Sequence, residues 1–403
     1  MEYDRIVLVG EMFMVKCERL DHFGRGICYL DKKIVFVRDL LPAEEAEVKI
    51  IKTKKKFSEG EVLFIKKKSP DRVFPKCPYN NCGCQLKHMD YKGQLAFKEN
   101  KVKDILKRYA DIDCTVNKII SSDHIYGYRN KVTLKVKNGV LGFYLMRTND
   151  IIEIKECALV SPLMNKIIGI LNTMDLSDVS EVVIKEFDGI MVFIKGNADT
   201  KLLESAVQSI YVNDKLIYGK EFIETSIDNL TFKVSPVSFF QVNKYMISKL
   251  YEIALKYVGN DYDKKILDLY CGTGTITLLL SKYFKEVIGV EINKESIKCA
   301  NINKKINGID NVQFICADAS EIVESLDADI VVVDPPRSGL TNKAIKDILR
   351  IGAEKIIYIS CDPMTLARDL KVLSKKYEVR EVTPVDMFPN TYHVESVTLL
   401  ERK

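Results

Sequence analysis

The sequence has no run of apolar residues long enough to span a bilayer, so a membrane-embedded protein is not expected. Its first residues, Met1 to Arg5, lack the charged and then apolar layout of a secretory signal. Eleven cysteines in 403 residues are too sparse, and odd in number, for the disulfide framework of a small secreted domain. These absences favour a cytoplasmic protein whose cysteines serve metal binding or thiol chemistry.

The sequence also has little excess of positive over negative charge. The formal net charge is only +5 at pH 7, so total charge says little about a nucleic-acid partner. What matters is that lysines gather in one stretch near the N-terminus. The length of 403 residues allows two or three domains, and an apolar content of 47% indicates globular domains.

Residues 12–68 alternate apolar and polar side chains in short runs, separated by turns that contain Gly, Asp or Pro. This pattern predicts a small β-barrel of about five strands, a fold that binds single-stranded nucleic acid. Phe57 and Phe64 lie among lysines, which suits phosphate contacts beside a stacking surface. A solvated strand face explains the same lysines equally well. They are Lys49, Lys52, Lys54, Lys55, Lys56, Lys66, Lys67 and Lys68.

Three domains are predicted, over residues 1–70, 71–230 and 231–403. The middle one starts with a cysteine-rich loop and continues as mixed α/β structure, with a helix over 93–110 and strands over 130–144. The last alternates apolar runs with amphipathic helical segments, which is typical of a parallel sheet with helices on both faces. Its expected strands are 264–270, 286–292, 312–318, 328–334, 354–360, 377–385 and 394–400, with helices between the first five and their neighbours.

The first of these strands ends at Tyr270 and runs into Cys271-Gly-Thr-Gly-Thr before a helix. A glycine turn lets the backbone approach a ligand closely, and the helix that follows presents unpaired N–H groups. Glu291 ends the second strand, where its carboxylate can accept hydrogen bonds from both ribose hydroxyls of a nucleotide-like ligand. Asp318 after the third strand can lie near an adenine amino group, and Asp334 ends the fourth.

An NAD site is the alternative for this edge of the sheet, but the turn lacks the full G-x-G-x-x-G spacing. The phrase D-L-x-C-G-x-G, followed by a strand that ends in E-x-N, resembles instead a class I S-adenosylmethionine (SAM)-dependent methyltransferase. That resemblance implies a Rossmann-like α/β fold for the last domain.

Cys361 follows the fifth strand in Ser360-Cys361-Asp362-Pro363. A thiol at a strand tip that faces the cofactor is placed for nucleophilic attack, whereas a thiol within the strand would be inert packing. Glu395, at the start of the last strand, is a candidate general base. His393 is the rival, because a histidine titrates near neutral pH.

Four phrases together, S-C-D-P, H-V-E-S, D-P-P-R and D-L-Y-C-G-T-G, resemble the RNA uracil-5-methyltransferase family over nearly the whole chain. The D-H-F-G-R-G and F-V-R-D-L-L-P-A-E phrases resemble that family's RNA-binding TRAM domain, an OB-like barrel. The resemblance implies RNA as a partner and SAM as cofactor. It assigns cofactor contacts to Gln241, Tyr270, Glu291 and Asp334, the nucleophile to Cys361 and the base to Glu395. For Gln241, in F-x-Q-V-N, the alternative is the start of a core helix.

Family members with a TRAM domain often bind a [4Fe-4S] cluster, and the resemblance implies four cysteine ligands here. These are Cys77, Cys82, Cys84 and, from a separate loop, Cys157. The spacing within the first loop is shorter than in the family pattern, and zinc is the alternative metal.

The chemistry expected of this family explains the thiol. Carbon 5 of uracil is a poor nucleophile until a thiolate adds to carbon 6 and makes an enolate, after which a base must remove the carbon 5 proton. The target uridine must first be extruded from its stack. Ribosomal RNA is the expected substrate and transfer RNA the runner-up, with a monomeric enzyme.

Two other functions are compatible with parts of the sequence. A cytosine-5-methyltransferase shares the covalent chemistry but places a Pro-Cys nucleophile after the fourth strand, where this chain has Asp334-Pro-Pro-Arg. A non-catalytic RNA-binding iron–sulfur protein would not need the intact S-C-D-P and H-V-E phrases.

Overall fold

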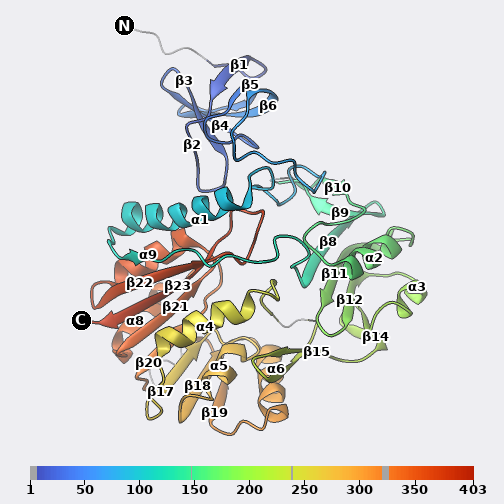
Figure 1. The fold of residues 1–403 in the computed structure, drawn as a ribbon. Coiled ribbons are helices and arrows are strands. Elements are labelled where there is room, and N and C mark those ends of the chain that lie inside the picture. Colours follow the sequence, from blue (N-terminus) through green and yellow to red (C-terminus); the bar gives the residue numbers. More distant parts are fainter. Residues whose placement is uncertain (1–6, 147, 237–238, 320–325) are drawn as a thin grey trace. The chain divides into compact units, whose positions relative to one another are not determined.

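The computed structural model describes residues 7–146, 148–236, 239–319 and 326–403. Figure 1 shows the helices and strands of the chain, coloured along the sequence. The chain divides into two compact units. The first comprises residues 1–101 and 388–392, and the second comprises residues 102–387 and 393–403. The predicted domain boundaries at residues 70 and 230 fall inside these units and stay a prediction.

The N-terminal strands of the first unit form one six-stranded sheet in the order β1-β5-β6-β4-β3-β2. The expected barrel of about five strands is thus a curled half-barrel with one more strand, because a two-residue strand is added at the edge. Three register shifts between the long strands β5 and β6 help the sheet to curl. The strands are β1 (Met12–Lys16), β2 (Arg19–Leu20), β3 (Gly26–Leu30), β4 (Lys33–Val37), β5 (Glu45–Thr53) and β6 (Phe57–Lys67).

Period-two alternation builds the core of this sheet. Ala46, Val48 and Ile50 of β5 are fully buried, while the residues between them are more exposed. They pack with buried side chains of the other strands, among them Val15 and Val35. The alternation leaves the basic residues of these strands toward solvent.

A buried ion pair joins the sheet to the chain that follows it. The Glu44 carboxylate is fully buried and accepts two bonds from the Arg72 guanidinium, at 2.5 and 2.7 Å. It also accepts the backbone N–H groups of Leu41 and Ser69. Burial alone would raise the pKa of Glu44, but these donors outweigh it and lower the pKa. The buried Glu44 carboxylate therefore stabilises the fold only while these hydrogen-bond donors are present.

The helix expected over 93–110 is confirmed. α1 (Tyr91–Ile105) continues into a π-helical turn (Leu106–Ala110), and the turn ends where Asp111 adopts a φ of 57°. The strands expected over 130–144 are also present, as β8 (Lys131–Lys137) and β9 (Val140–Tyr144). The pattern-based prediction therefore holds for the parts of this region with clear periodicity.

In the second unit, β8 and β9 belong to a seven-stranded sheet in the order β10-β9-β8-β11-β12-β13-β14. Helix α2 buries Met164, Ile167, Ile168 and Leu171, which are spaced along one helix face. The remaining elements are β10 (Ile151–Glu153), α2 (Pro162–Leu171), β11 (Val179–Glu186), β12 (Ile190–Gly196), α3 (Lys201–Glu204), β13 (Ser209–Val212) and β14 (Lys215–Gly219), followed by the hairpin β15 (Ile223–Ile227) and β16 (Leu230–Val234).

The C-terminal sheet has eight strands in the order β19-β18-β17-β20-β21-β23-β22-β7. The first five run parallel, and β23 enters antiparallel between β21 and β22. All seven predicted strands are confirmed, and β7 adds an edge strand from before the central sheet. They are β7 (Thr115–Val116), β17 (Lys265–Leu269), β18 (Glu286–Glu291), β19 (Val312–Cys316), β20 (Ile330–Val333), β21 (Lys355–Ser360), β22 (Tyr377–Val385) and β23 (Glu395–Arg402).

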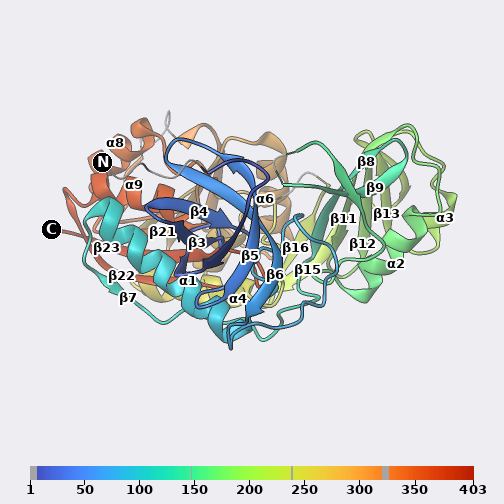
Figure 2. The same cartoon turned by 90° about the horizontal axis from the view of Figure 1, so that it is seen from above.

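Helices cover both faces of this sheet, as expected for a doubly wound fold. Figure 2 shows α8 and α9 on one side of β21 and β23 and α4 on the other. The helices are α4 (Ile247–Val258), α5 (Thr275–Leu280), α6 (Lys294–Ile306), α8 (Asn342–Ile351) and α9 (Pro363–Leu373). The segment expected to be helical between β19 and β20 includes residues 320–325, which lie outside the described residues.

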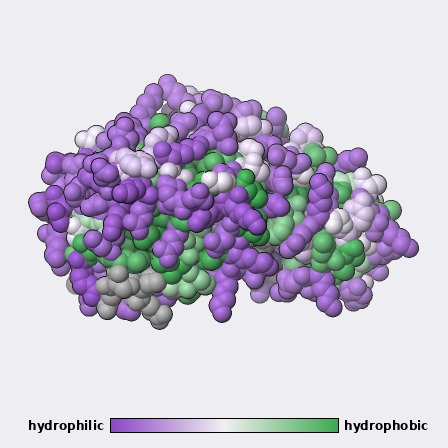
Figure 3. Space-filling model, turned by 90° about the horizontal axis from the view of Figure 1, so that it is seen from below, coloured by the Kyte–Doolittle hydropathy of each residue, from purple (hydrophilic) through white to green (hydrophobic). Residues whose placement is uncertain are grey.

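Within the described residues no helix is both long and apolar enough to cross a membrane. In Figure 3, hydrophilic side chains cover most of the face that is drawn, and apolar side chains gather in several areas between them.

The Glu44–Arg72 pair gives a stability prediction. Glu44→Gln removes the negative charge and leaves the Arg72 guanidinium partly buried without its counterion, so the free energy of unfolding should fall by about 3 kcal/mol. Denaturant unfolding of the full chain measures this. Glu18→Gln, on an exposed residue nearby, is the matched control. A loss below about 0.5 kcal/mol for Glu44→Gln would show that the pair contributes no net stability.

Candidate active site

The parallel strands of the C-terminal sheet bring the candidate residues to one edge. β17, β18, β19, β20 and β21 are paired in parallel, so their carboxyl ends lie side by side. Each candidate residue ends one of these strands or follows it closely: Tyr270, Glu291, Asp318, Asp334 and Cys361. This is the edge at which open α/β sheets bind their ligands.

The turn after β17 is shaped by three residues in the left-handed region, Tyr270 (φ 65°), Gly272 (φ 55°) and Gly274 (φ 79°). A side chain at Gly274 would meet the Phe314 ring at 2.5 Å, so this position needs glycine for space as well as for conformation. Tyr270 lacks the conformational freedom of glycine at positive φ. A positive φ at a bulky residue is strained, and such strain is typical of ligand-binding turns.

Glu291 is fixed against this turn. Its carboxylate accepts the N–H of Gly272 at 3.2 Å and the N–H of Asn293 at 2.8 Å. Asn293 in turn caps α6 by accepting the Ser296 N–H. These bonds orient the Glu291 carboxylate at the end of β18 and leave each oxygen with a further lone pair for a ligand hydroxyl.

Tyr270 lies near two of the candidate carboxylates. Burial raises the pKa of its phenol to about 12, and the negative charges of Asp318, Asp369 and Glu291 act in the same direction. The hydroxyl therefore stays protonated and can act as a hydrogen-bond donor. The Asp318 and Glu291 carboxylates therefore lie near enough to the Tyr270 phenol to influence its pKa.

Asp268 is a further candidate residue for this site, in addition to those predicted from the sequence. It is fully buried on β17 and accepts the Thr277 hydroxyl at 2.5 Å. Burial raises its pKa to about 8 despite that bond, with smaller contributions from Asp334 and Glu291. Its Oδ1 atom has no hydrogen-bond partner among the described residues. A buried carboxylate oxygen normally has a hydrogen-bond partner, so this atom is available to a ligand. The sequence feature that indicates Asp268 is its position as the first residue of the D-L-Y-C-G-T-G phrase.

Gln241 lies in the loop before α4, not at the start of a core helix. Its amide donates to Asp334 at 3.5 Å, and its backbone carbonyl accepts the Asn130 side chain at 2.9 Å. Burial raises the pKa of Asp334 to about 7. The F-x-Q-V-N loop therefore meets the D-P-P-R loop at the strand edge.

Cys361 and Glu395 are brought together by strand register. Ser360, the last residue of β21, pairs with Ser396 of β23. Cys361 and Glu395 occupy the next position along this antiparallel pair, where facing residues lie close together. Cys361 is partly exposed, whereas Glu395 is 3% exposed. His393 precedes β23 and lies outside this strand pair.

The electrostatics of the pair are dominated by burial. Burial raises the pKa of Cys361 to about 12, and the carboxyl groups of Glu395 and Asp334 raise it further. Burial and Asp334 likewise raise the pKa of Glu395 to about 8. The Arg337 guanidinium opposes both shifts. Arg337 is the second candidate residue not predicted from the sequence, although it belongs to the D-P-P-R phrase.

Comparisons with known proteins agree with this geometry. The tRNA (Uracil-5-)-methyltransferase family model matches residues 197–330 and 323–403, and the TRAM domain model matches residues 7–63. A protein of Clostridium tetani described as an uncharacterized RNA methyltransferase is 40% identical over 94% of this chain and 93% of its own. One of Caldanaerobacter subterraneus with the same description is 35% identical over 98% of this chain and 99% of its own.

The chain belongs to the RNA uracil-5-methyltransferase family. Among solved structures, the Pyrococcus abyssi tRNA (uracil-54, C5)-methyltransferase in complex with S-adenosyl-L-homocysteine superposes with a TM-score of 0.80. It is 28% identical and covers 96% of this chain and 99% of its own. The protein is therefore a SAM-dependent uracil-5-methyltransferase acting on RNA, and the predicted fold class is confirmed. The cytosine-5 and non-catalytic alternatives are not supported.

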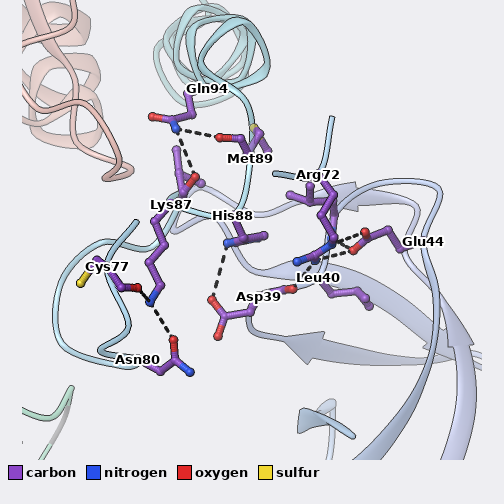
Figure 4. Close-up of polar contacts among 12 residues, drawn as sticks. Asp39, Leu40, Glu44, Arg72, Cys77, Asn80, Lys87, His88, Met89 and Gln94 are labelled. Carbon is purple, nitrogen blue, oxygen red and sulfur yellow. Dashed lines mark hydrogen bonds and ion pairs between the residues drawn. The ribbon is translucent and has the colours of Figure 1, made fainter. Parts of the chain in front are cut away.

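The methyltransferase also carries the cysteine loop of the first unit (Figure 4). The Cys77 and Cys82 thiols both approach the Tyr79 carbonyl, at 3.9 and 3.8 Å. The buried Lys87 ammonium donates to the carbonyls of Cys77 and Tyr79 and to the Asn80 side chain, at 2.7 to 2.9 Å. The loop is therefore folded around a lysine that uses three donors.

The predicted metal ligands are divided between the units, because Cys157 belongs to the second one. Its backbone is bracketed by Asn165, which accepts the Cys157 N–H and donates to the Cys157 carbonyl. In the described part of the chain, no three His, Cys, Asp or Glu side chains are grouped as a metal site. The cluster stays a prediction.

Arg337 gives a prediction about pH. Removing a cation disfavours nearby anions, so Arg337→Gln should raise the pKa values of both Cys361 and Glu395 above those of the wild type. If both groups act as anions, the pH profile of single-turnover methylation should shift to higher pH by about one unit. Arg337→Lys, which keeps the charge, should leave the profile near that of the wild type. An unshifted profile for Arg337→Gln would show that the guanidinium does not act on these groups.

Proposed function

We propose that Cys361 is the nucleophile and Glu395 the general base of uracil-5 methylation in this enzyme. The observation that carries this proposal is their adjacency, one position beyond the Ser360–Ser396 pair, at the sheet edge that also holds the glycine turn. Cys361 is partly exposed, so this residue is not sealed within the core. The proposed contacts of SAM are Gln241, Tyr270, Glu291, Asp318 and Asp334.

The proposed reaction starts when the Cys361 thiolate forms a bond to carbon 6 of an extruded uridine, which moves negative charge to carbon 5. Bound SAM supplies an electrophilic methyl group to that carbon. Glu395 then removes the carbon 5 proton, the carbon 6–sulfur bond breaks, and Cys361 leaves as a thiolate. The raised pKa values of Cys361 and Glu395 mean that both are mainly protonated in the ligand-free site at neutral pH.

The helix after Cys361 suits this role. The Asp362 side chain caps α9 by accepting the N–H groups of Met364 and Thr365. Pro363 occupies the first turn, where a missing N–H costs nothing. Cys361 therefore lies just before the positive end of a helix dipole, which favours a thiolate.

Replacement of Glu395 should separate formation of the covalent adduct from removal of the carbon 5 proton. Glu395→Gln should still form the bond between Cys361 and RNA but fail to remove the proton, so a covalent RNA–protein band that resists denaturation should accumulate. Gel electrophoresis with labelled RNA measures it. His393→Ala is the matched comparison, since His393 lies two residues away. If His393→Ala accumulates the adduct and Glu395→Gln does not, His393 is the base.

Ribosomal RNA is the proposed substrate, supported by the resemblance to family members that combine a TRAM domain with a cysteine loop. Transfer RNA is the second candidate, because the Pyrococcus abyssi enzyme with the same fold acts on tRNA by its description. Mapping 5-methyluridine in both RNA classes from cells with and without the gene tests this. Loss of the mark from ribosomal RNA is expected, and loss from transfer RNA alone would replace the proposal.

A [4Fe-4S] cluster held by Cys77, Cys82, Cys84 and Cys157 is also proposed, with zinc as the alternative. Four thiolates suit such a cluster, and the Lys87 ammonium would offset part of their negative charge. Its role would be structural or directed to RNA, because methyl transfer moves no unpaired electrons. Iron and zinc analysis of protein purified without oxygen distinguishes the two metals.

A further inference from the structure

A five-residue segment, 388–392, belongs to the first unit although the residues on both sides of it belong to the second. The segment runs Phe-Pro-Asn-Thr-Tyr. Glu395, the proposed base, follows Tyr392 by three residues and opens β23. Anything that fixes this segment therefore constrains the chain that leads directly into the base.

One face of α1 holds the segment. The Lys98 ammonium donates to the Phe388 carbonyl at 2.9 Å, and the Lys101 ammonium donates to the Tyr392 carbonyl at 2.9 Å. Between them, the Gln94 side chain accepts the N–H of the central asparagine, residue 390, at 2.7 Å. Gln94, Lys98 and Lys101 have the i, i+4, i+7 spacing of a single helix face.

The burial of these side chains shows that the contacts are specific. Gln94 is 1% exposed, Lys98 0% and Lys101 8%. Burying an ammonium is strongly unfavourable unless it is hydrogen-bonded, so two lysines would not be placed here for packing alone. Lys98 and Lys101 are about 290 residues away in the sequence from the carbonyl groups that they bind. Local secondary structure alone therefore does not bring them together.

The end of the cysteine loop also contacts the segment. The Leu86 N–H donates to the Asn390 carbonyl at 3.0 Å. The Gln94 side-chain amide donates to the Leu86 carbonyl at 3.2 Å and to the Met89 carbonyl at 2.9 Å (Figure 4). Gln94 therefore links the end of the cysteine loop to the 388–392 segment.

The N-terminal sheet adds a further contact at the end of the segment. The Phe23 ring, in the loop between β2 and β3, meets the Tyr392 ring edge-to-face at 5.5 Å between centroids. Such a geometry is favourable for two aromatic rings. The TRAM sheet is therefore in contact with the residue that lies three positions before the proposed base.

The chain on the other side of the segment is also fixed. In the second unit, the side-chain amide of Asn243 donates to the Met387 carbonyl at 3.1 Å, and Asn243 is fully buried. Asn243 closes the F-x-Q-V-N phrase that contains Gln241. The residues before and within the segment are therefore held by groups that do not belong to β22 or β23.

We propose that Gln94 and Lys98 are positioning residues for Glu395, acting through the 388–392 segment. The inference rests on the proposed role of Glu395 as base. Cys361 is held separately, by β21 and by the capped start of α9. Loosening the segment therefore affects proton removal by Glu395 and leaves attack by Cys361 intact.

The test uses Lys98→Met in the full-length enzyme, because methionine keeps an unbranched buried side chain and removes the donor. With unmodified RNA and SAM, the steady-state covalent adduct should rise about tenfold over the wild type, and turnover should fall by a similar factor. The single-turnover rate of adduct formation should stay within about twofold. Lys92→Met, on an exposed residue of α1, is the matched control and should behave as the wild type.

A purely structural role for Lys98 would lower both steps together and accumulate no adduct, which would overturn the inference. Glu395→Gln serves as the reference in the same gel. If Glu395→Gln itself accumulates no adduct, the proposed role of Glu395 as base is contradicted, whatever the result for Lys98→Met. If Lys98→Met does not fold, Phe23→Leu decides instead, because Phe23 is 53% exposed and the change removes its ring contacts with Tyr392 and with the Arg25 guanidinium. Absence of adduct in folded Phe23→Leu would then overturn the inference.

Discussion

The pairing of β23 with β21 is the constraint on which the rest of the site depends. The parallel strands alone place Cys361 at their carboxyl edge beside Asp334, which follows β20 and is proposed to contact SAM. Because β23 enters antiparallel, its first residue, Glu395, arrives at that same edge next to Cys361. One change of strand direction thus brings together two groups that are separated in the chain by a helix and a strand.

Burial then sets the chemistry of these groups. Asp268, Asp334 and Glu395 are three neighbouring carboxyl groups, and burial raises the pKa of each. Their mutual repulsion is limited while some are protonated, which lets the sheet edge hold several acids near a thiol. Arg337 is the cation that favours the anionic forms of Cys361 and Glu395, so the D-P-P-R loop contributes to both proposed steps.

The sequence predicts the repeating elements well and the isolated ones poorly. The seven strands of the C-terminal sheet are confirmed because long apolar runs between amphipathic helices have few alternative structures. The N-terminal sheet has six strands because β2 has only two residues and carries no periodic signal. The candidate site residues Tyr270, Glu291, Asp318, Asp334 and Cys361 are predicted from their place at strand ends, which parallel topology brings together.

Other features of the site are evident only in the three-dimensional structure. Asp268 and Arg337 lie within recognised phrases, but only burial and charge distinguish them from their neighbours. The contacts of Gln94, Lys98 and Lys101 with residues 388–392 join positions about 290 residues apart, and a lysine-containing helix face gives no sign of its acceptors. Sequence periodicity predicts which side of a helix is covered, but not which distant carbonyls it meets.

The most direct test of the account is to find the atom that attacks the uridine. An RNA carrying 5-fluorouridine at the target position has no proton for Glu395 to remove, so the enzyme and SAM should form a lasting adduct. Proteolysis and mass spectrometry then identify the modified peptide. A nucleotide attached to Cys361 is expected; attachment to another residue, or the absence of any adduct from active enzyme, would contradict the role of Cys361 as nucleophile.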